Sequence, residues 1–249
     1  MASPVILITG ASRGIGAATA RLAAARGYHV AFTYHSRESE ANEVRRQVEE
    51  RGQRSLAIQA DLSKEEDVLK IWRDATAEFE RIDVLVNNVG ILEQQTRFED
   101  LDAARLRRIF ETNVIGTMLC SREAVRHMST KHGGKGGAIV NLSSLAAKLG
   151  SPNEYVDYAA SKAAVDTMTV GLAKEVAEEG IRVNSVRSGS AYTEIHASGG
   201  EPDRVDRVAK VVPMRRGAQP EEIAESVLWL ASDAASYVTG SILDVAGGQ

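Results

Sequence analysis

The 249-residue sequence contains a single cysteine, Cys120, and no long block of like charge. One cysteine excludes an intramolecular disulfide and a cysteine-based metal cluster. The five histidines show no paired ligand spacing, so we predict no metal site. The formal net charge is -4 and no basic patch is visible, which argues against a nucleic-acid partner. Arg105, Arg107 and Arg108 alternate with apolar residues, and we interpret them as the solvated face of a helix.

Long hydrophobic runs are also missing. The first apolar run, Val5 to Gly10, follows only four residues and is too short for a signal peptide or a membrane span. Hydrophobic residues make up 43% of the chain and charged residues 26%, as in ordinary globular proteins. We therefore expect a cytoplasmic protein with no membrane partner.

Short, nearly continuous apolar runs alternate with segments of helical length. Such runs are typical of parallel strands that are covered on both faces. They are VILIT (5–9), HVAFTY (29–34), SLAIQAD (55–61), DVLVNNVG (83–90), GAIVNLSS (137–144), IRVNSVRS (181–188) and SILDVAGG (241–248). Repeated strand–helix–strand units predict right-handed crossovers and a doubly wound parallel α/β sheet of the Rossmann type, with helices on both faces. No linker or internal repeat is visible, so residues 1–249 are predicted to form a single domain.

Two of the predicted helices carry recognisable end signals. The Ala-rich segment 14–27 ends at Gly27, a typical helix stop. The segment 63–79 opens with Ser63 and has Glu66 three residues later, the pattern of a capping box.

Three glycines follow the first predicted strand, in TGASRGIG (9–16). Glycine lets the backbone approach a pyrophosphate closely, and the N-terminus of the following helix offers free N–H groups and the positive end of its dipole. A turn with a purely structural role would use glycine as well. Because the glycines lie between a strand and a helix at the start of the sheet, we favour a dinucleotide-binding turn.

Tyr158 and Lys162 are four residues apart and share one face of a predicted helix. Hydride transfer to a carbonyl requires a proton donor for the oxygen, and tyrosine can serve if its pKa is lowered towards neutrality. A neighbouring ammonium favours the tyrosinate, so we expect Lys162 to lower the pKa of Tyr158. Tyr155 is seven residues from Lys162, two helical turns away, and is expected to line the substrate pocket or to pack.

In their order along the chain, these motifs resemble the short-chain dehydrogenase/reductase family over the whole sequence. The elements that carry the resemblance are TGASRGIG, Asp61-Leu62, NNVG (87–90), Asn113, Ser144, Tyr158-x-x-x-Lys162 and the terminal glycine pair. The resemblance implies an NADP(H)-dependent oxidoreductase acting on a ketone, sugar or alcohol. It also implies a homo-oligomer, a dimer or a tetramer.

The family pattern assigns a catalytic role to four residues, Asn113, Ser144, Tyr158 and Lys162. Ser144 would orient the substrate oxygen, but its gap to Tyr158 is one residue longer than usual, so Ser143 stays an alternative. Asn113 would bind a water in a proton relay to Lys162; the alternative is a helix-interior asparagine bonded to backbone. Lys162 would also hold the nicotinamide ribose. A Ser-His-Asp hydrolase fits poorly, because the sequence has no G-x-S-x-G motif.

The end of the second predicted strand indicates the cofactor. An acidic residue there would bind the ribose 2′-hydroxyl of NAD. This chain instead has Tyr34, His35, Ser36 and Arg37, and Arg13 in the glycine turn could reach the same place. Cations and hydroxyls suit a 2′-phosphate, so we predict NADP(H). The alternative is that both arginines are surface charges, and the nearby Glu38 argues for caution.

Other cofactor contacts follow from the resemblance. Asp61 would contact the adenine amino group, or else cap a turn. Asn87 is as consistent with a role inside the sheet as with a ligand contact. The full predicted cofactor-binding set is Gly10, Ser12, Arg13, Gly14, Ile15, Gly16, His35, Ser36, Arg37, Asp61, Leu62, Asn87, Val89, Gly90, Tyr158, Lys162, Gly189 and Thr193.

The chain departs from the family pattern after the sixth predicted strand. Ser188 stands where proline is usual, which predicts a looser turn beside the nicotinamide. A substrate lid is expected at about 190–215, with hinges at Ser198, Gly199 and Gly200. Arg215 and Arg216 keep a 3-oxoacyl thioester possible as substrate. A protein that senses NADP(H) without turnover is the alternative from another functional class.

Overall fold

Seven parallel strands form one sheet in the computed structural model, which describes residues 3–249. The strand order is β3-β2-β1-β4-β5-β6-β7. The strands are β1 (Val5–Ile8), β2 (His29–Tyr34), β3 (Ser55–Gln59), β4 (Val84–Asn87), β5 (Gly137–Ser144), β6 (Ile181–Ser188) and β7 (Ile242–Val245). All seven predicted runs contain a strand, and the predicted doubly wound parallel sheet is confirmed.

The strands are apolar because both faces of the sheet are covered. In β1, Ile6 and Ile8 belong to one buried cluster, and Val5 and Leu7 belong to another on the opposite face. This is the alternation that a strand imposes on successive side chains. The near-continuous apolar runs of the sequence therefore reflect two cores, one on each side of the sheet.

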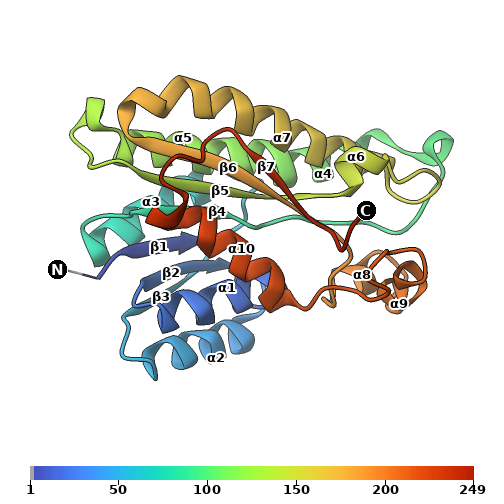
Figure 1. Cartoon of the computed structure of the whole chain (residues 1–249), viewed down its shortest axis with the longest axis horizontal. Coiled ribbons are helices and arrows are strands. Elements are labelled where there is room, and N and C mark those ends of the chain that lie inside the picture. The colour runs from blue at the N-terminus through green and yellow to red at the C-terminus, as the bar shows by residue number, and fades with distance from the viewer. Residues whose placement is uncertain (1–2) are drawn as a thin grey trace.

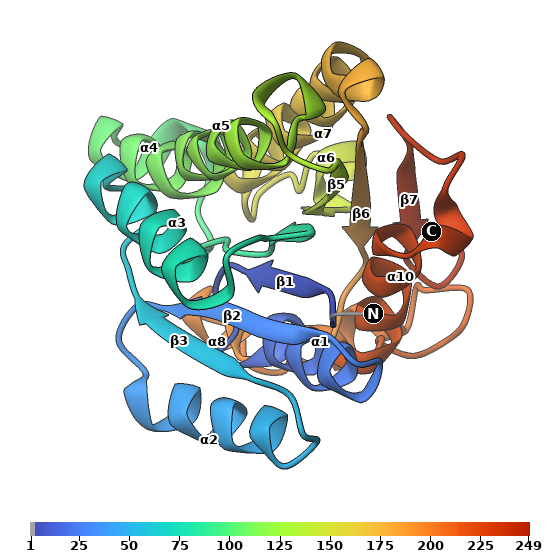
Figure 2. The ribbon, with the colours of Figure 1, turned by 90° about the vertical axis from the view of Figure 1, so that its left-hand side faces the viewer.

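Six longer helices make up the two covering layers, which Figure 2 shows on opposite sides of the sheet. One core is completed by α1 (Gly14–Ala25), α2 (Glu38–Glu49) and α10 (Pro220–Ala231). The other is completed by α3 (Glu65–Phe79), α5 (Thr117–Met128) and α7 (Val156–Val176). Before α5, α4 (Ala103–Phe110) runs into a π-helical turn, Glu111–Gly116.

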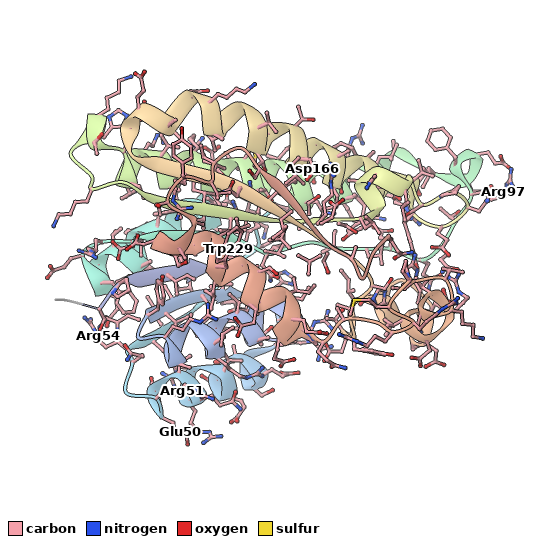
Figure 3. The ribbon with its side chains drawn as sticks, in the orientation of Figure 1. Glu50, Arg51, Arg54, Arg97, Asp166 and Trp229 are labelled. Carbon is pink, nitrogen blue, oxygen red and sulfur yellow. The ribbon has the colours of Figure 1, made fainter. Side chains whose placement is uncertain are left out.

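Three short helices lie beyond the carboxyl ends of the strands, at the right of Figure 1. They are α6 (Ala146–Leu149), α8 (Ile195–Ser198) and α9 (Arg204–Ala209), and Figure 3 shows Arg97 on a loop at the same end. The remaining turns are single 3₁₀ segments at Phe98–Asp100, Thr130–His132, Ala177–Glu179 and Asp233–Ala235. The strand order reverses between β1 and β4, and in such sheets ligands bind outside the carboxyl ends at this switch point.

The helix-end predictions had mixed outcomes. Helix α1 stops at Ala25 and Gly27 adopts φ +87°, which confirms the predicted stop. The capping box at Ser63 is wrong, since α3 begins at Glu65 and has no side-chain cap. The Ser63 hydroxyl instead donates to Asp61 Oδ1 at 2.7 Å, and Lys64 holds the N-cap position of α3.

Arg105 corrects the prediction of a solvated basic helix face. Arg107 and Arg108 are exposed as expected, but the Arg105 side chain is only 10% exposed and pairs with the fully buried carboxylate of Asp157. Arg105 Nε donates to Asp157 Oδ2 at 2.6 Å, and Nη1 donates to the Gln94 carbonyl at 2.6 Å. This ion pair ties α4 and the loop after β4 to the first turn of α7, one residue before Tyr158.

None of the helices within residues 3–249 has the length and apolar character that a membrane span needs. Within the same residues, no group of three or more histidine, cysteine, aspartate or glutamate side chains is placed to hold a metal ion.

The buried pair gives a stability prediction. Replacing Arg105 by Met leaves the Asp157 carboxylate buried without its partner, so the free energy of unfolding should fall by about 3–5 kcal/mol. Urea denaturation measures this change. Arg108→Met is the matched control on the same helix: Arg108 pairs with Glu93 at the surface, and its loss should cost at most about 1 kcal/mol. Equal losses in the two variants would contradict a structural role for the buried pair.

Candidate functional site

The glycine turn between β1 and α1 requires glycine at each of its three positions. Gly10 and Gly14 have φ values of +66° and +55°, which side chains rarely permit. At Gly16 an added Cβ would lie 2.4 Å from the Gly10 carbonyl oxygen, so only glycine lets the helix approach the turn this closely. No side chain caps α1, so the N–H groups of its first turn stay available for an anion.

Asn88 holds this turn in place. Its Nδ2 donates to the carbonyls of Thr9 at 2.9 Å and Gly10 at 2.7 Å. The neighbouring Asn87 is 2% exposed and instead joins the sheet interior, where it donates to Ser121 Oγ and Asn141 Oδ1. The predicted cofactor contact of Asn87 is therefore not seen, and its alternative role inside the sheet fits. The side chains of Asn87 and Asn88 have different partners because consecutive residues of a strand point to opposite sides.

One cavity of about 630 Å³ runs along the carboxyl ends of the strands. Its volume lies within the range of small-molecule sites. All predicted site residues line this cavity except Gly16, Asn87 and Asn113. Gly16 nonetheless contributes to the glycine turn, because it lies against the Gly10 carbonyl.

Several cations and hydroxyls line the cavity at the end of β2. Tyr34, His35, Ser36 and Arg37 all lie there, and Arg13 joins them from the glycine turn. The Arg37 guanidinium pairs with Glu40 at 2.9 Å, whereas Arg13 forms no ion pair with any residue in the range 3–249. Glu38, which argued for caution, is exposed and does not line the cavity.

Asp61 has the turn-capping role that was its predicted alternative, and its contact with the adenine stays a prediction. Its Oδ1 accepts hydrogen bonds from the Ser63 amide at 3.0 Å and from the Ser63 hydroxyl, which is the turn cap. Its Oδ2 lies 4.0 Å from His35 Nε2, and the residue lines the cavity. Burial raises the pKa of Asp61, but the Ser63 hydrogen bonds and the charges of His35 and Lys64 outweigh it, so the pKa is lowered overall.

Tyr158 and Lys162 lie side by side on α7, as their spacing predicts. Lys162 Nζ is 5.8 Å from the centre of the Tyr158 ring and donates to the Leu142 carbonyl at 2.7 Å. Lys162 is 4% exposed, and burial lowers its pKa to about 8 although Asp166 opposes the shift.

The pKa of Tyr158 shifts in the direction opposite to the predicted one. Burial raises it above its ordinary value, while hydrogen bonding to Ser144 and the charge of Arg204 pull it down in part. The predicted decrease rested on the neighbouring lysine, but the cost of burying a phenolate has the larger effect on the pKa of Tyr158. At neutral pH Tyr158 therefore keeps its proton.

Ser144 is the serine that acts on Tyr158, because it lowers the pKa of Tyr158 in part and lines the cavity beside it. The Ser143 hydroxyl instead donates to the Lys162 carbonyl at 3.2 Å. The chain between Ser144 and Tyr158 turns after α6, where Gly150, Ser151 and Asn153 adopt φ values of +77°, +45° and +62°.

Asn113 is fully buried in the π-helical turn. Its Oδ1 accepts from the Ile91 amide at 2.7 Å, and its Nδ2 donates to the Ile91 carbonyl and to Ser161 Oγ. These contacts fix the loop after β4 against α7, and they match the predicted alternative of an asparagine bonded to backbone. Binding of a relay water stays a prediction.

The turn after β6 is held without proline. Ser188 is the last residue of β6, its carbonyl accepts from the Leu145 amide, and its hydroxyl donates to the Gly189 carbonyl at 2.9 Å. Thr193 then packs over the glycine turn, because a Cβ on Gly14 would lie 3.2 Å from its Cγ2. The predicted looseness of this turn stays a prediction.

Four further side chains line the cavity but belong to no sequence motif, so they could not be predicted. They are Leu92, Leu149, His196 and Arg204. Tyr155 lines the cavity as predicted, and its hydroxyl donates to the Gly199 carbonyl at 3.0 Å. This bond attaches the segment of α8 to the start of α7.

Comparison with known proteins places this site in a family. Residues 10–249 match the family model described as Enoyl-(Acyl carrier protein) reductase. The chain is 54% identical to the "Uncharacterized oxidoreductase YgfF" of Escherichia coli (strain K12), over 98% of this chain and 99% of that protein. It is 42% identical to the "Cis-4-hydroxycyclohexanecarboxylate dehydrogenase" of Sinomonas cyclohexanicum, over 99% and 96% of the two chains.

Two similar solved structures contain nicotinamide cofactors. One is the 3-ketoacyl-(acyl-carrier-protein) reductase of Brucella melitensis complexed with NADH, with a TM-score of 0.91, 32% identity and coverage of 98% and 97% of the two chains. The other is a blue fluorescent protein from a metagenomic library in complex with NADPH, with a TM-score of 0.90, 32% identity and the same coverage, 98% and 97%.

Proposed function

Because this chain belongs to the short-chain dehydrogenase/reductase family of oxidoreductases, we propose that it transfers hydride between NADP(H) and a ketone or alcohol substrate. The observation that carries the proposal is the grouping of Ser144, Tyr158 and Lys162 in one cavity at the carboxyl end of β5. The glycine turn lines the same cavity. A cofactor on the turn and a carbonyl at Tyr158 would therefore share one space.

The residues present fit a nicotinamide dinucleotide. The uncapped N-terminus of α1 offers N–H groups to a pyrophosphate, and the positive φ values of Gly10 and Gly14 shape the turn that leads into it. Asp61 and Leu62 would hold the adenine. Arg13, His35 and Ser36 would hold a 2′-phosphate, which supports NADP(H) over NAD(H). The bound nicotinamide supplies or accepts the hydride.

The protein's own groups manage the proton. Tyr158 carries its proton at neutral pH and can donate it to the substrate oxygen as negative charge develops there. The Ser144 hydroxyl can donate a second hydrogen bond to the same oxygen. The Lys162 ammonium then stabilises the tyrosinate that is left. The raised pKa of Tyr158 keeps the phenol protonated, which is the form that reduction of a carbonyl needs.

The far wall of the cavity indicates a substrate with a hydrocarbon framework. Leu92, Leu145, Leu149, Ile195 and Val208 line it, which suits a ring or chain ketone better than a sugar. The relative named for cis-4-hydroxycyclohexanecarboxylate, an alicyclic alcohol, supports this substrate class.

A second candidate is reduction of a 3-oxoacyl thioester. Similarity to a 3-ketoacyl-(acyl-carrier-protein) reductase favours it, and the same three catalytic groups would serve. Activity on acyl thioesters without activity on free ketones would separate it from the first candidate.

We also propose that the chain assembles as a homo-oligomer. Ile115 in the π-helical turn and Met118 at the start of α5 are 48% and 44% exposed, and Trp229 on α10, labelled in Figure 3, is 41% exposed. Tyr237 near β7 is fully exposed. Two separate apolar surfaces of this kind suit a dimer or a tetramer.

The test of function is NADPH oxidation across a carbonyl panel of alicyclic and aromatic ketones, aldoses and a 3-oxoacyl thioester. Wild-type protein should turn over one class, and Tyr158→Phe should lower kcat by about 10²- to 10⁴-fold because it removes the proton donor. Tyr155→Phe is the matched control, since it removes a neighbouring hydroxyl that bonds only to the Gly199 carbonyl, and it should lower kcat far less. Tight NADPH binding with no turnover on any member would instead support the sensor alternative.

Cofactor preference gives a second prediction. NADPH should bind more tightly than NADH, and Arg13→Gln should weaken NADPH binding about tenfold or more while changing NADH binding little, because only NADPH carries the 2′-phosphate. Fluorescence titration measures both constants. Arg21→Gln, on the same helix but outside the cavity, is the control. Equal or tighter binding of NADH by the wild type would refute the assignment.

A further inference from the structure

Arg204 is a cation placed at the substrate end of the cavity. It opens α9, its side chain is 17% exposed, and it lines the cavity together with Tyr155 and Tyr158. Its guanidinium carbon lies 5.6 Å from the centre of the Tyr155 ring. The ring and the apolar wall shield it from water, so its charge acts at greater strength than that of a surface arginine.

The hydrogen-bonding capacity of Arg204 is only partly used. Nη2 donates to Glu154 Oε2 at 2.6 Å, and Nε reaches the same oxygen at 3.3 Å. Nη1 donates to no residue in the range 3–249. A guanidinium has five N–H donors, so a ligand with a pair of acceptor oxygens can bind the remaining ones.

The charged residues around Arg204 limit the charge of a ligand that can bind there. Glu154 accepts from both Arg204 and Arg207, and Arg207 also pairs with Glu201, so these four residues balance two positive against two negative charges. Because these charges already balance, every negative charge on a ligand is in excess, so a monoanion is favoured over a dianion such as a phosphate. A planar monoanion, the carboxylate, matches one guanidinium.

His196 beside it adds no second cation. It is 8% exposed, and burial first, with the charge of Arg204, lowers its pKa, so it is neutral near pH 7. Its Nε2 donates to the Ala191 carbonyl at 3.1 Å. Arg204 and Tyr158 line the same cavity, and the Tyr155 ring that Arg204 packs against lines it as well. The two ends of one small substrate can therefore lie at Arg204 and at Tyr158.

We propose that Arg204 binds a carboxylate carried by the substrate, so that the enzyme acts on oxo acids or hydroxy acids whose hydrocarbon frame separates the two groups. The proposal rests on the proposed carbonyl and alcohol chemistry at Tyr158. The carboxylate positions the carbonyl against Tyr158 and Ser144. Arg204 is then the residue that determines substrate specificity.

The test compares 4-oxocyclohexanecarboxylate with its neutral isostere, 4-oxocyclohexanecarboxamide, in NADPH-dependent reduction. The wild type should prefer the carboxylate about tenfold or more in kcat/KM, the worth of one charge-assisted hydrogen-bonded pair. Arg204→Gln should bring the ratio close to one, and the loss should fall on KM for the carboxylate. Arg207→Gln is the matched control: it removes a partner of the same Glu154 but does not line the cavity, so the ratio should stay as in the wild type.

The outcomes separate this proposal from the proposed function. Turnover of both ketones without a preference, or an equal loss on both in Arg204→Gln, overturns the carboxylate site and leaves the carbonyl chemistry standing. The second of these results would mark Arg204 as only an anchor for the lid. If neither ketone is turned over, the proposed function fails for this class of ketone, and calorimetry of cyclohexanecarboxylate against cyclohexanecarboxamide decides the site. Tighter carboxylate binding that is lost in Arg204→Gln supports it, and equal binding of the two overturns it.

Discussion

The buried ammonium of Lys162 is the interaction on which the arrangement of the site depends. Its hydrogen bond to the Leu142 carbonyl joins the middle of α7 to β5, and its stem passes Tyr158 on the same helix face. The loop after β4 leaves space for the ammonium because residue 90 is glycine, where a Cβ would lie 3.1 Å from Lys162 Nζ. A charge buried in this way is costly unless it is satisfied, which explains both its depressed pKa and the close fit of the backbone around it.

Two buried carboxylates fix α7, the helix that carries the Lys162 ammonium. Asp157 pairs with Arg105 at the first turn of α7, and Asp166, labelled in Figure 3, pairs with Arg187 of β6 at 2.8 Å. Tyr158 and Lys162 lie between these two anchors. The parallel sheet supplies the rest, since its strands all end at one edge and bring the glycine turn, Ser144 and Ser188 to one cavity. Rigid elements thus position Tyr158, the proposed proton donor, and loops complete the cavity.

Patterns with a strict period or spacing could be predicted from the sequence, and contacts between distant loops could not. The strands, the glycine turn and the Tyr158–Lys162 pair follow from local rules, and the structure shows each of them. Arg105 was misplaced because its partner is 52 residues away and no local signal distinguishes it from Arg108. Arg204 was missed for the same reason, since Glu154 precedes it by 50 residues. The pKa of Tyr158 depends on burial, which spacing alone does not reveal.

The most direct test of this account is the titration of Lys162 in the folded protein, followed by NMR of the lysine side chains with Lys162→Arg to assign the signal. The account predicts one lysine that titrates near pH 8 and is absent from the variant. A Lys162 signal that titrates at the value of a free lysine, about 10.4, would contradict the buried ammonium and, with it, the physical basis proposed for the site.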